Sequence, residues 1–186
     1  MPYDPPPELS ALNLAEIADL VAARRLPPLE SWEPVQEGDS EMRIATDGRW
    51  FHQSGEITRP AMVRAFSTLL MRDETGQHWL VTPHERLRIA VEDAAFIAVD
   101  VKRDGAGADA ALAFRLNTDE FVIAGPEHPL VAQGDTETPA LYLAVRHGCE
   151  ARLNRSTWAQ LAEIALAESD DAEITSLGER FSLVPA

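Results

Sequence analysis

The chain has 186 residues, 45% of them hydrophobic, which is enough apolar material for one large core or two small ones. Its formal net charge of −15 at pH 7 repels phosphate backbones, so a nucleic-acid polymer is not an expected partner. Cys149 is the single cysteine, which excludes an intramolecular disulfide and a thiolate metal cluster, and no apolar run is long enough to make a membrane an expected partner.

Residues 1–40 are predicted to form an N-terminal helix and a linker. Leucine and isoleucine recur near helical spacing over residues 9–21, and Ser10 or Asn13 can cap this helix. Residues 29–39 are expected to be a loop. The start of the chain has neither the basic nor the apolar region of a signal peptide, so we expect a cytoplasmic protein.

Residues 41–98 are predicted to form a first β-rich lobe with one helix. Apolar and polar residues alternate over 42–46, as in a half-buried strand. Pro60 then stands near the first position of a segment with an apolar helical face. Strands are predicted to follow at 78–81 and 87–91.

Residues 99–186 are predicted to form a second β-rich lobe that ends in a helix and a hairpin. A strand is predicted at 111–116, and residues 125–139 are expected to be a long loop of the kind that is often functional or mobile. Asn154 can cap a helix that runs to about Glu168. Two short strands are predicted over 173–184.

Two stretches of the chain share one predicted order of elements. Residues 54–91 and 147–184 both give turn, strand, helix, turn, strand, turn, strand, with Arg59 and Arg155 near corresponding helix starts. This order indicates an internal duplication, and the alternative is a chance match between common strand-helix-hairpin units. The expected fold class is therefore α+β, with two related β-rich lobes and an N-terminal helix.

A linear series of short motifs runs from Arg43 to Leu161. The motifs are Trp50, Gly55-Glu56-Ile57, Arg59-Pro60, Phe66, Leu70, Trp79-Leu80-Val81-Thr82-Pro83, Glu85, Ile89, Val91-Glu92-Asp93, Phe96, Gly125-Pro126, His128-Pro129 and the stretch from Arg146 to Leu161. This series resembles the bacterial "domain of unknown function 1285" family. Ala95 departs from the pattern, because proline is expected there.

The resemblance implies a duplicated two-lobe fold whose second lobe is similar to pleckstrin-homology-like barrels. It also implies a pocket between the lobes that takes a nucleotide-like ligand in a signalling role. No activity is established for the family, so the resemblance assigns no catalytic residue and no cofactor.

Four polar residues near predicted strand ends are candidate ligand contacts. Thr82 and Glu85 lie in a turn, where they can line a site or simply stabilise the turn. Glu92 and Asp93 are adjacent, so their side chains should point to opposite faces and not form the facing carboxylate pair of acid–base catalysis. One of them can bind a ribose hydroxyl, whereas the structural alternative is a cap or turn role for Asp93.

The candidate cations for an anionic ligand are Arg59, Arg146, Arg152 and Arg155, each near a strand end or a helix start. A helix N-terminus favours anions, and a neighbouring arginine strengthens that preference. These arginines can converge if the lobes face each other, or each can form an ordinary salt bridge. Trp50 is a candidate stacking surface for a base, with a place in the core as the alternative.

Neither a metal site nor a catalytic set is predicted. The five histidines lack the spacing of zinc ligands, and Cys149 near His147 lacks an oxyanion-hole element. We therefore expect a regulatory or signalling protein that binds a small ligand between its lobes, and a signalling protein as partner is compatible with this. The alternatives are a hydrolase acting on a nucleotide-like substrate and a protein-interaction adaptor.

Overall fold

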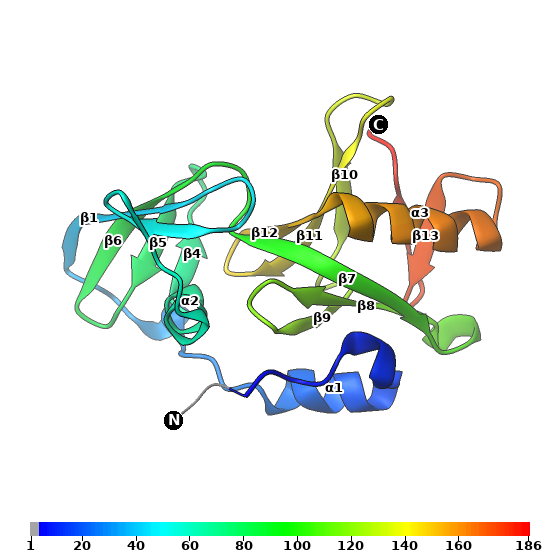
Figure 1. The fold of residues 1–186 in the computed structure, drawn as a ribbon, viewed down its shortest axis with the longest axis horizontal. Helices are drawn as coiled ribbons and strands as arrows, with labels where there is room; N and C mark the ends of the chain where they lie inside the picture. Colours follow the sequence, from blue (N-terminus) through cyan, green and yellow to red (C-terminus); the bar gives the residue numbers. More distant parts are fainter. Residues whose placement is uncertain (1–3) are drawn as a thin grey trace. The chain divides into compact units, whose positions relative to one another are not determined.

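The structure is a computed structural model that describes residues 4–186. Residues 1–3, which begin the predicted N-terminal segment, lie outside the described residues. The chain forms two compact units (Figure 1). Unit 1 holds Arg25–Phe96 and Val145–Glu150, and unit 2 holds Pro5–Arg24, Ile97–Ala144 and Ala151–Ala186. No helix among residues 4–186 has both the length and the hydropathy needed to cross a membrane.

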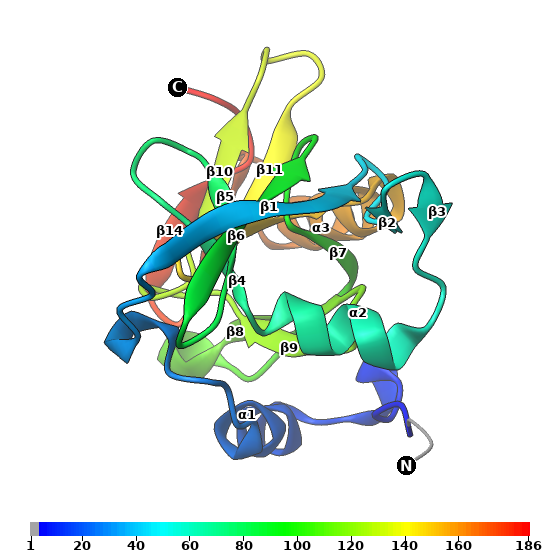
Figure 2. The same ribbon diagram turned by 90° about the vertical axis from the view of Figure 1, so that its left-hand side faces the viewer.

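Unit 1 is built on a six-stranded sheet with the strand order β3-β2-β1-β6-β5-β4. β1 and β6 run parallel and side by side (Figure 2), and the other described pairs of this sheet are antiparallel. The short helix α2 (Pro60–Ser67) connects β3 to β4. The strands are β1 (Gln36–Ile44), β2 (Trp50–His52), β3 (Gly55–Glu56), β4 (Leu70–Arg72), β5 (His78–Val81) and β6 (Glu85–Val91).

Unit 2 holds a second six-stranded sheet, with the order β10-β11-β12-β7-β8-β9, and a separate two-stranded sheet of β13 and β14. Its longest helix is α3 (Arg155–Glu168). The tip of the β11–β12 hairpin belongs to unit 1. The strands are β7 (Phe96–Asp104), β8 (Ala111–Leu116), β9 (Phe121–Ile123), β10 (Leu130–Gln133), β11 (Ala140–Arg146), β12 (Cys149–Leu153), β13 (Glu173–Ser176) and β14 (Glu179–Ser182).

The sequence predicts an N-terminal helix in a segment of its own, residues 1–40. In the structure this helix is part of unit 2. α1 (Leu14–Ala23) begins at Asn13, whose side chain forms a capping box with Glu16. The helix lies against β8 and β9 (Figure 1), where Ile17 is fully buried. The prediction missed this because burial of one helix face depends on strands about 100 residues away in the sequence.

The structure contains a repeat, but in a different register from the predicted one. Residues 36–91 and 96–153 each form six strands in which the first strand lies beside the sixth, giving matching strand orders. The predicted match of 54–91 with 147–184 is wrong, because β13 and β14 form their own sheet. The predicted match aligned α2 with α3, but these helices do not occupy equivalent places in the repeat. α2 follows the third strand of its sheet, whereas α3 follows the sixth.

Local signals predicted the starts of α2 and α3 well and the extent of two loops poorly. α2 begins with Pro60 at its first position, and Asn154 caps α3 by accepting the backbone N–H of Thr157 at 2.8 Å, both as predicted. The segment 125–139 is not entirely loop, because β10 lies inside it and pairs antiparallel with β11. The loop predicted over residues 29–39 ends earlier than expected, because β1 begins at Gln36.

Candidate functional site

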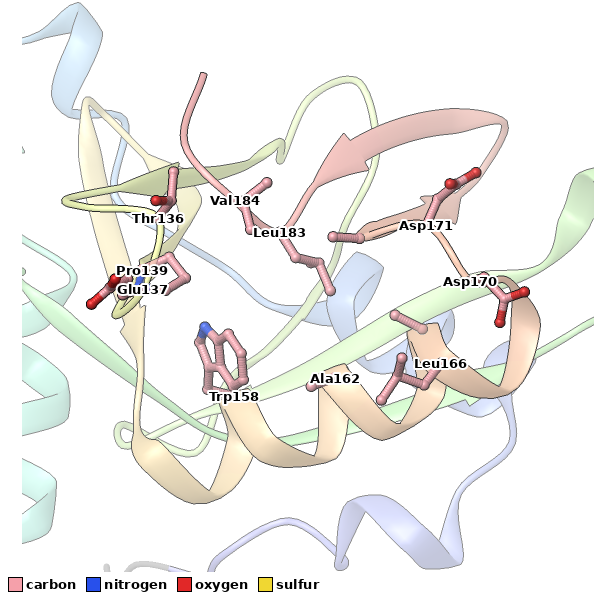
Figure 3. Close-up of a pocket in the computed structure, with 12 residues that line it drawn as sticks. Thr136, Glu137, Pro139, Trp158, Ala162, Leu166, Asp170, Asp171, Leu183 and Val184 are labelled. Carbon is pink, nitrogen blue, oxygen red and sulfur yellow. The ribbon is translucent and has the colours of Figure 1, made fainter.

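A cavity of about 260 Å³ opens beside α3 in unit 2 (Figure 3). Four segments supply its walls: the loop at 136–139, one face of α3 from Trp158 to Leu166, the turn at 170–172, and residues 183–184. Most of the exposed wall is apolar. Binding sites for small molecules are usually concave and mainly apolar with few polar groups, which makes this cavity the candidate site.

The sequence of α3 explains why space remains beside it. Trp158, Ala162, Ala165 and Leu166 are spaced four, three and one residues apart, so they share one face of the helix. Alanine at the two central positions fills little volume between the larger side chains at either end. The floor of the cavity is therefore a shallow apolar trough along the helix.

The C-terminal segment is held over this trough by a buried serine. Ser176 is 0% exposed, and its hydroxyl donates to the carbonyl of Ala124 at 2.7 Å and accepts the backbone N–H of Leu112 at 2.8 Å. These bonds fix the β13–β14 hairpin to the rest of unit 2. Leu183 and Val184, which follow β14, consequently form a wall of the cavity.

The loop at 136–139 is fixed by one carboxylate. Asp135 Oδ1 accepts the backbone N–H groups of Glu137 at 3.0 Å and Thr138 at 2.7 Å, and also the Thr138 hydroxyl at 3.0 Å. These hydrogen bonds, above all the one from the Thr138 backbone, lower the pKa of Asp135. The wall of the cavity that carries Pro139 is thus preorganised at neutral pH.

One polar atom in the wall lacks a partner. Trp158 Nε1 is buried and has no hydrogen-bond partner among the described residues. Figure 3 shows the nitrogen edge of the ring pointing away from α3, towards the segments that carry Pro139 and Val184. Trp50 Nε1 shares this lack, but Trp50 lies in a closed core, whereas Trp158 borders a cavity. An unpaired buried donor costs about 1–3 kcal/mol.

The charge around the cavity is negative. Glu137, Asp170 and Asp171 carry the ionisable side chains among its described lining residues, and none of these is basic. A phosphate or carboxylate placed here would therefore meet like charges. The cavity suits a ligand without negative charge.

The acidic and hydroxyl residues predicted for the site lie outside this cavity, in unit 1, where Thr82 and Glu92 have local structural roles. Thr82 Oγ1 accepts the backbone N–H of Glu85 at 3.1 Å, which stabilises the turn before β6. Glu92 pairs with Arg43 at 2.6 Å and also accepts the backbone N–H of Thr46. Asp93 is half-buried at the turn that follows β6. Their role in ligand binding stays a prediction.

The predicted arginines are distributed over both units. Arg146 donates to the carbonyl of Ser67 at 3.3 Å and lies over the ring of Phe96, while Arg152 lies 6.0 Å from the centre of the Tyr142 ring. Arg59, at the N-cap of α2 in unit 1, is exposed, as is Arg155 at the first position of α3 in unit 2. Their convergence on one anion stays a prediction.

Trp50 is a core residue and not a stacking surface. Its side chain is 1% exposed and stacks on Phe66, with 6.4 Å between ring centres. A base has no free face of this ring to contact. The core alternative for Trp50 is therefore the one observed.

The residues that line the cavity were not predicted as a site. The sequence predicts a helix that runs to about Glu168 and a long loop over residues 125–139. What the sequence could not show is that this loop, α3 and the last residues of the chain enclose one space. The two alanines between Trp158 and Leu166, on the same face of the helix, are the sequence feature that indicates the trough.

The chemistry of the side chains gives no support to the predicted alternative of a hydrolase. Burial raises the pKa of the Cys149 thiol to about 12, so this cysteine is not a ready nucleophile. Among residues 4–186, no group of three or more histidine, cysteine, aspartate or glutamate side chains is placed to hold a metal ion. The hydrolase hypothesis stays untested.

Two α+β domains, each built on a six-stranded sheet, define the class of protein. The chain belongs to the DUF1285 family: the model of the family's N-terminal domain, described as a domain of unknown function, matches residues 27–94, and that of its C-terminal domain matches residues 95–183. The family resemblance inferred from the motifs is thereby confirmed.

Two solved structures of this family are similar to the chain. A DUF1285 family protein from Silicibacter pomeroyi DSS-3 is 35% identical, with a TM-score of 0.76 over 94% of this chain and 96% of that one. A DUF1285 family protein from Shewanella baltica OS155 is 20% identical, with a TM-score of 0.53 over 66% of this chain and 90% of that one, which bears on the fold alone. No curated protein matches the chain.

Proposed function

We propose that this protein binds a small, mainly apolar ligand with a hydrogen-bond acceptor in the cavity beside α3, and that binding serves a regulatory role in the cytoplasm. The observation that carries the proposal is an apolar cavity whose wall contains the unpaired N–H of Trp158. A ligand acceptor that reaches this N–H relieves the cost of an unpaired donor. Because the atom is covered, neighbouring side chains must shift slightly to admit the acceptor.

The size of the cavity limits the ligand. Sites for drug-sized molecules usually enclose about 300–1,000 Å³. At about 260 Å³ this cavity suits a smaller molecule, and its mouth is partly open beside Leu166, which is 71% exposed. A single ring or a single unbranched chain, carrying one carbonyl group, fits these dimensions.

The nucleotide-like ligand implied by the family resemblance is part of the proposal in a restricted form. A neutral base offers an apolar ring and several acceptors, whereas a phosphate would meet the carboxylates of Glu137, Asp170 and Asp171. We therefore expect a free base to bind this cavity more tightly than the corresponding nucleotide. A pleckstrin-homology-like character of the second domain remains part of the same proposal.

The proposal is tested by screening neutral amides, ketones and free bases by thermal shift and then measuring affinity by titration calorimetry. Trp158→Phe keeps an aromatic ring but removes the donor, so binding should weaken roughly tenfold. Ala162→Leu fills the trough and should weaken binding by more than about tenfold.

Two matched variants control for indirect effects. Trp32→Phe makes the same chemical change in unit 1, and Ala159→Leu changes an exposed residue of α3 that does not line the cavity. Both should leave affinity unchanged within about twofold. If no compound of the panel binds, or if those that bind are indifferent to Trp158→Phe and Ala162→Leu, the proposed site is wrong.

A protein-interaction adaptor is the second candidate, because the mouth of the cavity carries exposed apolar side chains. Leu166 is 71% and Val184 is 37% exposed. Contiguous exposed apolar surface is typical of interaction sites. Leu166→Ser separates the two functions: it should abolish binding to a partner protein, while a small ligand bound at Trp158 should lose less than about threefold in affinity.

A further inference from the structure

The two ends of the cavity differ in chemistry. Trp158 stands near the start of α3, and Asp170 and Asp171 lie beyond its end, at the opposite end of the cavity (Figure 3). Leu166 lies eight positions after Trp158, which corresponds to a rise of about 12 Å along the helix. The carboxylates lie further along the chain than Leu166, so the whole apolar trough stands between them and the unpaired donor.

The carboxylate end of the cavity carries negative charge that the protein leaves largely uncompensated. The C-terminus of a helix is itself partially negative, and α3 has no basic residue in its last turn. Glu168 is neutralised by Arg103, with two contacts of 2.6 Å. Among the described residues, no ion pair involves Asp170 or Asp171, which are both exposed.

We propose that the ligand of this cavity is an apolar amine, with a carbonyl-type acceptor at one end and an ammonium group at the other. This inference rests on the proposed function and specifies the ligand class. The acceptor pairs with Trp158 Nε1, the apolar chain lies on Ala162 and Ala165, and the ammonium group meets Asp170 and Asp171. The cation offsets both the aspartates and the helix C-terminus.

A series of three primary amides tests this inference. All three share an alkyl chain long enough to cross the trough, which rises about 12 Å from Trp158 to Leu166, and they end in a methyl, an ammonium or a carboxylate group. Calorimetric titration of the full chain at low salt should give the tightest binding for the ammonium compound. It should bind about threefold more tightly than the methyl compound and about tenfold more tightly than the carboxylate compound.

Neutralising the rim should remove this preference. In the double variant Asp170→Asn, Asp171→Asn, the ammonium compound should lose its advantage. It should bind no more tightly than the methyl compound, because burying a charged end without a partner costs free energy. The matched double variant Asp19→Asn, Glu127→Gln removes the same net charge from exposed positions that do not line the cavity. It should keep the order of affinities seen in the unaltered protein.

The outcomes separate this inference from the proposed function. If all three amides bind with equal affinity and Trp158→Phe weakens each of them, the cavity is a ligand site but the amine preference is wrong. If the control double variant loses the preference as fully as the rim variant, net charge explains it and the inference is wrong. If none of the three amides binds at millimolar concentration, and the neutral panel also fails to bind, the proposed function itself fails.

Discussion

The indole N–H groups of Trp79 and Trp158 differ in whether they have a hydrogen-bond partner within the protein. Trp79 Nε1 donates to Asp73 Oδ2 at 2.9 Å, and the other oxygen of Asp73 accepts from Thr75 and Gln77. The bond from the Thr75 hydroxyl, followed by the one from Trp79, lowers the pKa of Asp73 to about 2. Trp79 is therefore part of a satisfied structural network, whereas Trp158 has a donor to offer to a ligand.

A buried histidine should make the stability of the protein depend on pH. His78 is 8% exposed in β5, and burial, together with the Arg72 guanidinium, lowers the pKa of its imidazole from 6.5 to about 4. The folded state thus favours the neutral ring more strongly than the unfolded chain does. The stabilisation is complete above pH 6.5 and is lost as the pH falls from 6.5 to about 4.

His78→Gln removes this titration and serves as the test. Urea unfolding at pH 7 and pH 5 should show that the unaltered protein loses more stability over this interval than the variant does. An exposed histidine replaced in the same way, His52→Gln, should behave as the unaltered protein. Equal losses in the His78→Gln variant and the unaltered protein would mean that His78 does not carry this dependence.

The β11–β12 hairpin shows how a turn is fixed by its backbone. His147 and Gly148 both have positive φ angles, as in a tight two-residue turn, and the carbonyl of His147 accepts the backbone N–H of Arg72 at 2.8 Å. A Cβ on Gly148 would lie 2.6 Å from the backbone oxygen of Arg72. Glycine is required here by close approach as well as by conformation.

Gly148→Ala should therefore destabilise the protein by roughly 3 kcal/mol, the combined cost of a strained φ and a backbone clash. Gly178→Ala is the matched control, because Gly178 has φ +80° and nothing within 4 Å of the added Cβ. It should cost about 1 kcal/mol from conformation alone. Equal losses in chemical denaturation of the two variants would contradict the role of the Arg72 contact.

Elements with local signals were predictable, and elements defined by distant partners were not. The proline at the start of α2 and the asparagine cap of α3 act within one turn of helix, so the sequence alone locates both helices. β10 has one buried residue and is a strand because it pairs with β11. The candidate site depends even more on residues that are far apart in the sequence. Residues 136–139 and 183–184 come together with α3 only in the folded unit.

At the scale of the whole molecule, the family's domain boundary and the compact units do not coincide. The family models divide the chain between residues 94 and 95, but Val145–Glu150, from the C-terminal family domain, belongs to unit 1. These residues supply the His147 carbonyl bonded to Arg72 and the Arg146 guanidinium bonded to Ser67. Unit 1 is therefore incomplete without them.

A fragment that covers residues 25–96 should consequently fail to fold cooperatively. It retains all six strands of its sheet but lacks the hairpin tip that covers β4. Circular dichroism of the fragment should show no cooperative thermal transition, whereas the full chain should unfold cooperatively. A fragment that melts cooperatively near the temperature of the full chain would show that the tip is dispensable.

The central claim, that a ligand binds beside Trp158, is tested most directly by the indole N–H signals in a two-dimensional ¹⁵N NMR spectrum. The chain has four tryptophans, so four such signals are expected, and the Trp158→Phe spectrum assigns one of them. On titration with benzamide, a neutral apolar amide, the Trp158 signal should move downfield as its N–H gains an acceptor. A titration that moves another tryptophan's signal instead, or leaves all four in place up to the solubility limit, would contradict the account.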